Sequence, residues 1–189
     1  ARKYARGNKN MIVWVEKSFA NSFGNLARLK SSMFKTATNV VFVLTDTAPA
    51  VYTIEAVHEI VEQNMANVVG VIPGKSKVNE FVVFSGHYAA GTTAVIMLAK
   101  YFKKLGNNER TLVFAAFTAE EVGGFGSQYF SRQLDPDKVM AMFNIEMIGT
   151  ESKWGKNSAY ITGYDKTNMG EILAKDLQGT EFNFYPDPY

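Results

Sequence analysis

The residues with the clearest chemical potential in this sequence are acidic side chains and a histidine that follow apolar segments. Glu120 and Glu121 end one apolar run, His87 follows a second, and Glu146 follows a third. A histidine together with several carboxylates suits zinc, or manganese or cobalt in its place. Of two adjacent acids, one can bind the metal while the other stays free to take a proton from a water molecule there.

The apolar run that begins at Leu112 is the element that must position the two adjacent acids. A continuous apolar run of this kind, bounded by polar residues, is typical of a strand buried on both faces. Glycines at 123, 124 and 126 then allow a tight turn. We therefore expect Glu120 and Glu121 just beyond the carboxyl end of a core strand, where open α/β sheets bind their ligands.

The rest of the chain alternates between strand-like and helix-like patterns, which predicts an α/β fold. Strands are predicted at 11–15, 39–44, 67–72, 80–85, 139–145 and 159–162, and helices at 21–35, 92–105, 127–134 and 168–177. The first strand–helix–strand unit favours a parallel pair. Residues 75–79 and 182–189 are predicted as loops, and 52–65 fits either a helix or a strand. In such a sheet the strand ends that carry His87, Glu120, Glu121 and Glu146 converge on one edge.

Composition limits the kinds of site that this chain can build. The 189 residues carry a net charge of +2, which gives no reason to expect a nucleic-acid partner. No apolar run approaches the roughly 20 residues of a membrane span. The absence of cysteine rules out disulfides and thiolate metal sites. A metal site must therefore use carboxylates, carbonyls, His58 or His87.

Each candidate ligand also has an ordinary structural explanation. A histidine after a strand is often a hydrogen-bonding or surface residue, and the pair of glutamates could cap a helix that begins near Gly126. Glu146 could pair with an arginine or lysine. His58 lies in a periodic segment, and we expect no metal role for it. The coincidence of the other residues at one sheet edge favours a metal site.

Four segments of the sequence together resemble the M28 family of di-zinc aminopeptidases. They are Phe84-Ser-Gly-His-Tyr88, the stretch 91–99, the stretch 110–130 with its Thr-Ala-Glu-Glu-Val-Gly-Gly, and Phe143-Asn-Ile-Glu-Met-Ile-Gly149. The resemblance runs from about residue 67 to the end in the right order and spacing. It implies a phosphorylase/hydrolase-like zinc peptidase fold, with a mixed, mostly parallel central sheet flanked by helices.

The resemblance also implies a role for each candidate residue. His87 would bind one zinc ion together with Glu146, Glu121 would bind a second, and Glu120 would be the general base that acts on a zinc-activated water. The expected enzyme is a metal-dependent exopeptidase that removes N-terminal residues from peptides. By the same resemblance we expect a secreted or periplasmic location.

The sequence departs from the family pattern in its set of metal ligands. The family carries a bridging Asp in a loop after the His-Tyr pair, but Tyr88 runs directly into Ala89-Ala90-Gly91. The family's last ligand, a histidine, lies beyond the point where this chain ends. We expect both ligands to exist in the natural protein outside these residues. Glu146 stands where the family usually has Asp, which shifts the metal position and weakens the argument for strict aminopeptidase specificity.

These patterns divide the chain into two predicted regions and leave other functions open. Residues 67–189 would form the zinc peptidase domain, incomplete at its C-terminus, and residues 1–66 either part of a protease-associated-like subdomain or a family-specific one. A glutaminyl-cyclase-like relative, which binds a single zinc, and a carboxypeptidase-like relative are alternatives. A peptide-binding homologue that has lost its metals is a third, and Glu120 argues against it.

Overall fold

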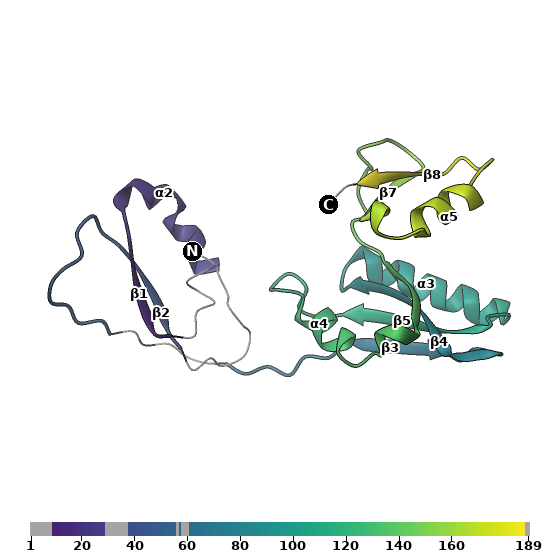
Figure 1. The fold of residues 1–189 in the computed structure, drawn as a ribbon, viewed down its shortest axis with the longest axis horizontal. Coiled ribbons are helices and arrows are strands. Elements are labelled where there is room, and N and C mark those ends of the chain that lie inside the picture. Colours follow the sequence, from purple (N-terminus) through teal and green to yellow (C-terminus); the bar gives the residue numbers. More distant parts are fainter. Residues whose placement is uncertain (1–8, 29–37, 56, 58–60, 188–189) are drawn as a thin grey trace.

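The computed structural model describes residues 9–28, 38–55, 57 and 61–187 (Figure 1). The strands are β1 (Met11–Val15), β2 (Val40–Leu44), β3 (Val68–Ile72), β4 (Lys77–His87), β5 (Arg110–Phe117), β6 (Val139–Asn144), β7 (Ser158–Thr162) and β8 (Asn183–Asp187). The α-helices are α2 (Ala20–Phe23), α3 (Ala90–Leu105), α4 (Phe125–Ser131) and α5 (Met169–Asp176). Short 3-10 helices occupy Lys17–Phe19, Gly24–Arg28, Pro136–Lys138 and Tyr164–Lys166.

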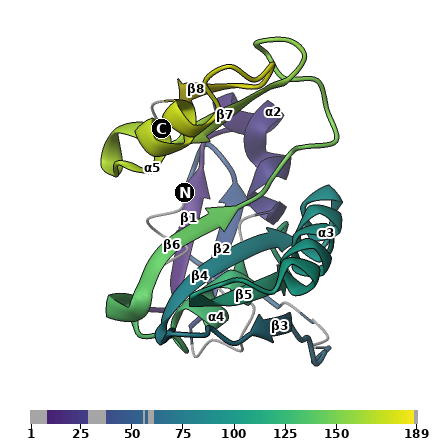
Figure 2. The ribbon, with the colours of Figure 1, turned by 90° about the vertical axis from the view of Figure 1, so that its right-hand side faces the viewer.

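The central sheet has the strand order β3-β5-β4-β6. β5 pairs in parallel with β4, β4 pairs in parallel with β6, and β3 runs antiparallel to β5 at the edge. Figure 2 shows these strands side by side, with α3 along the sheet. The predicted mixed, mostly parallel sheet flanked by helices is therefore confirmed.

β5 is the central support of this sheet because both of its faces are buried. Apart from the half-buried Arg110 at its start, every residue of the strand is buried. Its side chains alternate between two apolar clusters. On one face Val113, Ala115 and Phe117 pack with Val83 of β4 and Phe130 of α4. The continuous apolar run in the sequence correctly predicted this strand.

The opposite face of the sheet packs against α3. Leu112 and Phe114 of β5 join Phe84 of β4 and Val95 of the helix. The Phe84 ring stacks on those of Phe102, Phe114 and Phe143, with centroids 5.3–5.5 Å apart. Leu98 and Ala99 complete the helix stripe, as its periodicity predicted. Both faces of β5 are thus covered, which makes the carboxyl end of the central strands a rigid base for a site.

Several predicted boundaries were wrong, and for two of them the cause is strand pairing with a distant part of the chain. Residues 77–79, predicted as loop, belong to β4, where Lys77 pairs with Arg110. The tail predicted as loop contains β8, which pairs in parallel with β7. The helix predicted at 127–134 begins earlier and ends at Ser131. Such pairings depend on partners more than 20 residues away, which a local pattern does not identify.

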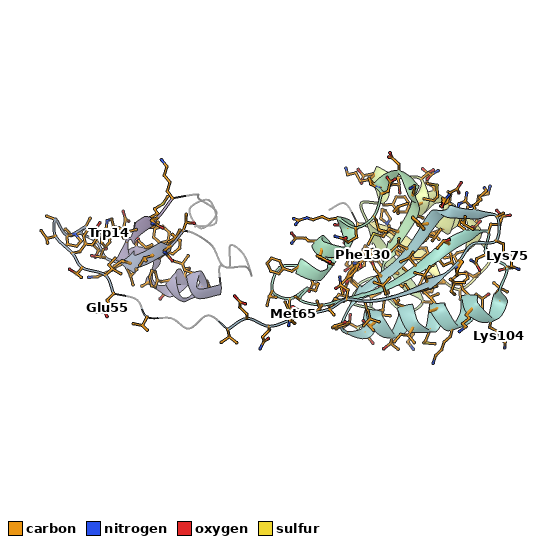
Figure 3. All side chains as sticks on the ribbon, turned by 90° about the horizontal axis from the view of Figure 1, so that it is seen from below. Trp14, Glu55, Met65, Lys75, Lys104 and Phe130 are labelled. Carbon is orange, nitrogen blue, oxygen red and sulfur yellow. The ribbon has the colours of Figure 1, made fainter. Side chains whose placement is uncertain are left out.

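The predicted strand pair near the N-terminus is confirmed, because β1 and β2 pair in parallel. The helix predicted between them at 21–35 begins earlier, as short helical turns from Lys17 to Arg28, and its remainder lies outside the described residues. Within 52–65 the described residues form neither helix nor strand; Figure 3 labels Glu55 and Met65 in this stretch. His58 lies outside the described residues. None of the helices in the described part of the chain is long and apolar enough to cross a membrane.

Close backbone packing at the start of α3 gives the first prediction. A Cβ atom on Gly91 would overlap the carbonyl oxygen of Ile145, which follows β6. We expect Gly91→Ala to lower the free energy of unfolding by about 2 kcal/mol, the usual scale for forced overpacking. Urea denaturation measures this change.

Gly70 in β3 provides the matched control, because no atom lies within 4 Å of a Cβ built there. We expect Gly70→Ala to leave the free energy of unfolding unchanged or to raise it by up to about 1 kcal/mol, because alanine is favoured over glycine in a strand where there is space for its Cβ. Equal effects of the two substitutions would contradict the close contact between α3 and the end of β6.

Candidate metal centre

His87 is the last residue of β4, and its backbone is fixed on both sides. Its carbonyl oxygen accepts hydrogen bonds from the Ala89 amide and from the Thr92 hydroxyl, each at 2.7 Å. The next amide, that of Tyr88, donates to the carbonyl of Phe117 at 3.1 Å and extends the pairing with β5. The imidazole side chain is 16% exposed. The ring is therefore held at the sheet edge with little freedom to move.

The register between β4 and β6 brings Glu146 to His87. Ser85 is paired with Asn144, and the Ile145 amide donates to the Ser85 carbonyl at 2.8 Å, which carries the pairing beyond the end of β6. Side chains two residues apart lie on the same face of a strand. His87 and Glu146 consequently face each other, and Oε2 of Glu146 contacts Nδ1 of His87.

The turn after β5 carries Glu120 and Glu121. The carbonyl of Glu120 accepts hydrogen bonds from the amides of Gly123 and Gly124, both at 2.9 Å. These glycines have φ angles of +132° and +66°, which residues with a Cβ atom rarely adopt. The glycine run is thus used for the tight turn that the sequence predicted.

Asn67, which comes just before β3, ties both ends of this turn together. Its Oδ1 accepts from the Thr118 amide at 3.1 Å, and its Nδ2 donates to the Gly126 carbonyl at 2.8 Å. A Cβ on Gly126 would overlap Thr118 and Asn67. Asn67 was not predicted as a site residue, because nothing in the local sequence connects it to a turn more than 50 residues away.

His87, Glu120 and Glu121 each offer a ligand atom within 4.8 Å of the others. Nε2 of His87 lies 3.8 Å from Oε1 of Glu121, on the ring edge opposite Glu146. The Glu121 side chain is 85% exposed, whereas that of Glu146 is 32% exposed. One side of the imidazole therefore faces a partly buried carboxylate, and the other faces an open acidic turn.

The ordinary structural explanations for these acids are not supported by the described residues. α4 follows the turn with Gly124 at its N-cap and has no side-chain capping hydrogen bond, so neither glutamate caps it. Among the ion pairs of the described residues, none joins a lysine or arginine to Glu120, Glu121 or Glu146. Among the described residues, no lysine or arginine therefore offsets the negative charges at this edge.

The buried ring nitrogen of His87 indicates that the residues fit a metal ion. Nδ1 is buried, and although Oε2 of Glu146 approaches it closely, the geometry is not that of a hydrogen bond. A buried polar atom without a hydrogen-bond partner is costly. Two ligands of one cation bring a nitrogen and a carboxylate oxygen close together in the same way, without a hydrogen bond between them. The set of nitrogen and oxygen donors is one that zinc accepts.

Two residues beside the acids adopt a left-handed backbone conformation. Ala119, just before Glu120, has φ +54°, and Met147, just after Glu146, also has φ +54°. Residues other than glycine occupy this region at a cost of about 1–2 kcal/mol. The chain therefore reverses abruptly on leaving β5 and β6, and both reversals hold a carboxylate at the sheet edge.

Comparison with known proteins identifies the family. The sequence model of Peptidase family M28 matches residues 67–188. The chain belongs to peptidase family M28. The M28 match contains His87, Glu120, Glu121 and Glu146, and it begins at the residue that ties the acidic turn together.

A solved structure supports the same fold. The chain is similar to an aminopeptidase from Aneurinibacillus sp. strain AM-1, with a TM-score of 0.51 and 19% sequence identity. The match covers 65% of this chain and 34% of that one, so this M28 chain spans about a third of that aminopeptidase. Comparison with curated proteins gives no match.

The strained backbone at Ala119 gives the second prediction. We expect Ala119→Gly to raise the free energy of unfolding by about 0.5–1 kcal/mol. Glycine removes the strain of the left-handed conformation in the folded state, but it also increases the conformational entropy of the unfolded chain, which offsets part of the stabilisation. Thermal or urea denaturation measures the change.

Ala141 is the matched control, because it lies within β6, where the backbone is extended. We expect Ala141→Gly to lower the free energy of unfolding by about 0.5–1 kcal/mol. Destabilisation of the same size by Ala119→Gly would show that the turn is not strained.

Proposed function

We propose that the protein is a zinc-dependent exopeptidase that removes N-terminal residues from peptides. The observation that carries this proposal is the convergence of His87, Glu120, Glu121 and Glu146 at the carboxyl edge of β4, β5 and β6. Membership of peptidase family M28 supports peptide hydrolysis, and the similar solved structure is named an aminopeptidase. Secretion or export to the periplasm stays a prediction from family resemblance.

His87 and Glu146 are the proposed ligands of one ion, and Glu121 is the proposed ligand on the other side of the ring. When bound, zinc makes a water molecule more acidic and polarises the scissile carbonyl. The contact between Nδ1 of His87 and Oε2 of Glu146 supports the first assignment. The exposed position of Glu121 leaves its carboxylate free of other ion pairs among the described residues, apart from the approach to His87.

Glu120 is the proposed general base. Its carboxylate belongs to the same cluster as His87 and Glu121, and it is exposed at the turn. A carboxylate that does not itself hold the metal can take a proton from the attacking water and pass it to the leaving amine. The fixed backbone of the turn holds this group beside the ligands before substrate arrives.

Removal of the proposed base gives the third prediction. We expect Glu120→Gln to lower kcat by about 100-fold or more, because the amide cannot accept the proton, and to leave metal content unchanged. Hydrolysis of an aminoacyl anilide and metal analysis of the same samples measure both quantities.

Glu109 provides a control with the same substitution, since this exposed residue lies just before β5, at the opposite end of the sheet. Figure 3 labels Lys75 and Lys104 at that end, far from Phe130. Glu109→Gln should leave kcat unchanged. Full activity in Glu120→Gln would exclude this residue as the base.

Metal removal gives the fourth prediction. We expect a chelator to abolish hydrolysis and added zinc to restore it, and we expect His87→Gln to lose at least one bound ion per molecule. His58→Gln, the same change at the other histidine of the sequence, should keep the metal content of the wild type. Metal analysis by mass spectrometry measures the stoichiometry.

The stoichiometry also separates the proposed enzyme from its relatives. Two zinc ions in the natural protein would support the exopeptidase, whereas a single ion would favour the glutaminyl-cyclase-like alternative. Absence of bound metal in the purified natural protein would contradict both and would support a non-catalytic peptide-binding homologue.

A further inference from the structure

A chain of hydrogen bonds connects the core of the sheet to the carboxylate of Glu146. The hydroxyl of Ser85, which is fully buried, donates to Oδ1 of Asn144 at 2.8 Å. Nδ2 of Asn144 then donates to Oε1 of Glu146 at 3.1 Å. The other oxygen of that carboxylate, Oε2, faces Nδ1 of His87. Both carboxylate oxygens are therefore engaged, each by a different neighbour.

The chemistry of the partners determines which way the Asn144 amide faces. An ionised carboxylate only accepts hydrogen bonds, so the NH₂ group of the amide must be the part that faces Glu146. The amide oxygen then faces Ser85, whose hydroxyl can donate to it. If the amide were flipped, its oxygen would face Oε1 of Glu146, and two acceptors would then oppose each other. The NH₂ group would face the Ser85 hydroxyl, which could no longer donate to the amide.

The side chain of Glu146 needs such a restraint more than a shorter acid would. A glutamate has one more rotatable bond than the aspartate usual at this position in the family, and fixing a long side chain costs entropy. Glu146 also lies beyond the end of β6, and the next residue, Met147, has a left-handed backbone conformation. Strand pairing therefore does not by itself fix the carboxylate.

We propose that Asn144 is a positioning residue of the metal centre, which holds Oε1 of Glu146 so that Oε2 lies against Nδ1 of His87, the other proposed ligand atom. Ser85 in turn fixes the amide of Asn144. Outer partners that orient metal ligands typically contribute about 10- to 100-fold in metal affinity. The inference rests on the metal centre of the proposed function, but it concerns how one ligand is held rather than whether the enzyme is an exopeptidase.

The experiment measures zinc affinity of the purified natural protein by competition with a chromogenic chelator. We expect Asn144→Ala to weaken zinc binding by about 10-fold or more. Asn144→Leu, whose side chain has a similar branched shape but no polar atom, should weaken it to the same extent if the hydrogen bond rather than packing is responsible. Unchanged affinity in both variants, with zinc still bound by the wild type, would overturn the positioning role and leave the proposed function intact.

Asn108 supplies the matched control. Its amide donates to backbone carbonyls including those of Pro73 and Arg110, next to the amino ends of the central parallel strands. We expect Asn108→Ala to lower the melting temperature without changing zinc affinity. A loss of affinity in this control equal to that in Asn144→Ala would show a general effect of destabilisation and would overturn the inference.

A double-mutant cycle tests the part assigned to Ser85. We expect Ser85→Ala to weaken zinc binding in the wild-type background and to have no further effect in Asn144→Ala, because its influence passes through the amide. Additive effects would contradict this chain of contacts. Wild-type protein that binds no zinc would instead overturn the proposed function itself, so the two failures are distinguishable.

Discussion

The parallel pairing of β4 with β6 is the constraint on which the candidate site depends. Its register sets Ser85 opposite Asn144 and so brings His87 and Glu146 face to face. A shift of one residue would turn Glu146 toward the face covered by α3 and separate it from the histidine. The apolar clusters on the two faces of the sheet oppose such a shift, because it would expose Phe143 and bury Met142. Core packing thus protects the geometry of the polar site.

The site has two halves that the fold holds in different ways. His87 and Glu146 are partly buried and are brought together by strand pairing, and the hydrogen bonds from Ser85 to Asn144 and from Asn144 to Glu146 restrain the carboxylate. Glu120 and the exposed Glu121 lie on a turn, which glycines and the side chain of Asn67 keep tight. The first half is suited to holding an ion in one position. The second is open to solvent, as the proposed reaction of a water molecule with a peptide requires.

This division explains why buried strands and a strained backbone occur together here. β5 is buried on both faces and gives the turn a rigid base. Ala119 and Met147 then adopt left-handed conformations that turn the chain sharply beside Glu120 and Glu146. Strain of this kind persists only where other interactions of the folded structure hold the residue in place, and it often marks functional sites. Groups held in advance lose less entropy when substrate binds, which is the basis of preorganised catalysis.

Local sequence patterns determined the types of element and the candidate ligands. The apolar run from Leu112 predicted β5, the helical stripe around Val95 predicted α3, and the acids after apolar runs predicted the sheet edge that carries them. These features depend on residues close in the chain, where periodicity and turn chemistry are visible. The same patterns gave no sign of β8, because its backbone hydrogen bonds join it to β7, more than 20 residues earlier.

Only the tertiary structure decided which polar groups act on one another. Ser85 and Asn144 lie in two motifs that the sequence singled out, yet their contact with each other depends on strand register. Asn67 precedes β3, and only the fold places its amide between Thr118 and Gly126. The sequence alone thus determined which residues could bind a metal or move a proton. The fold decided which of them are held together, because register and side-chain hydrogen bonds between distant segments are properties of the packed sheet rather than of any local stretch.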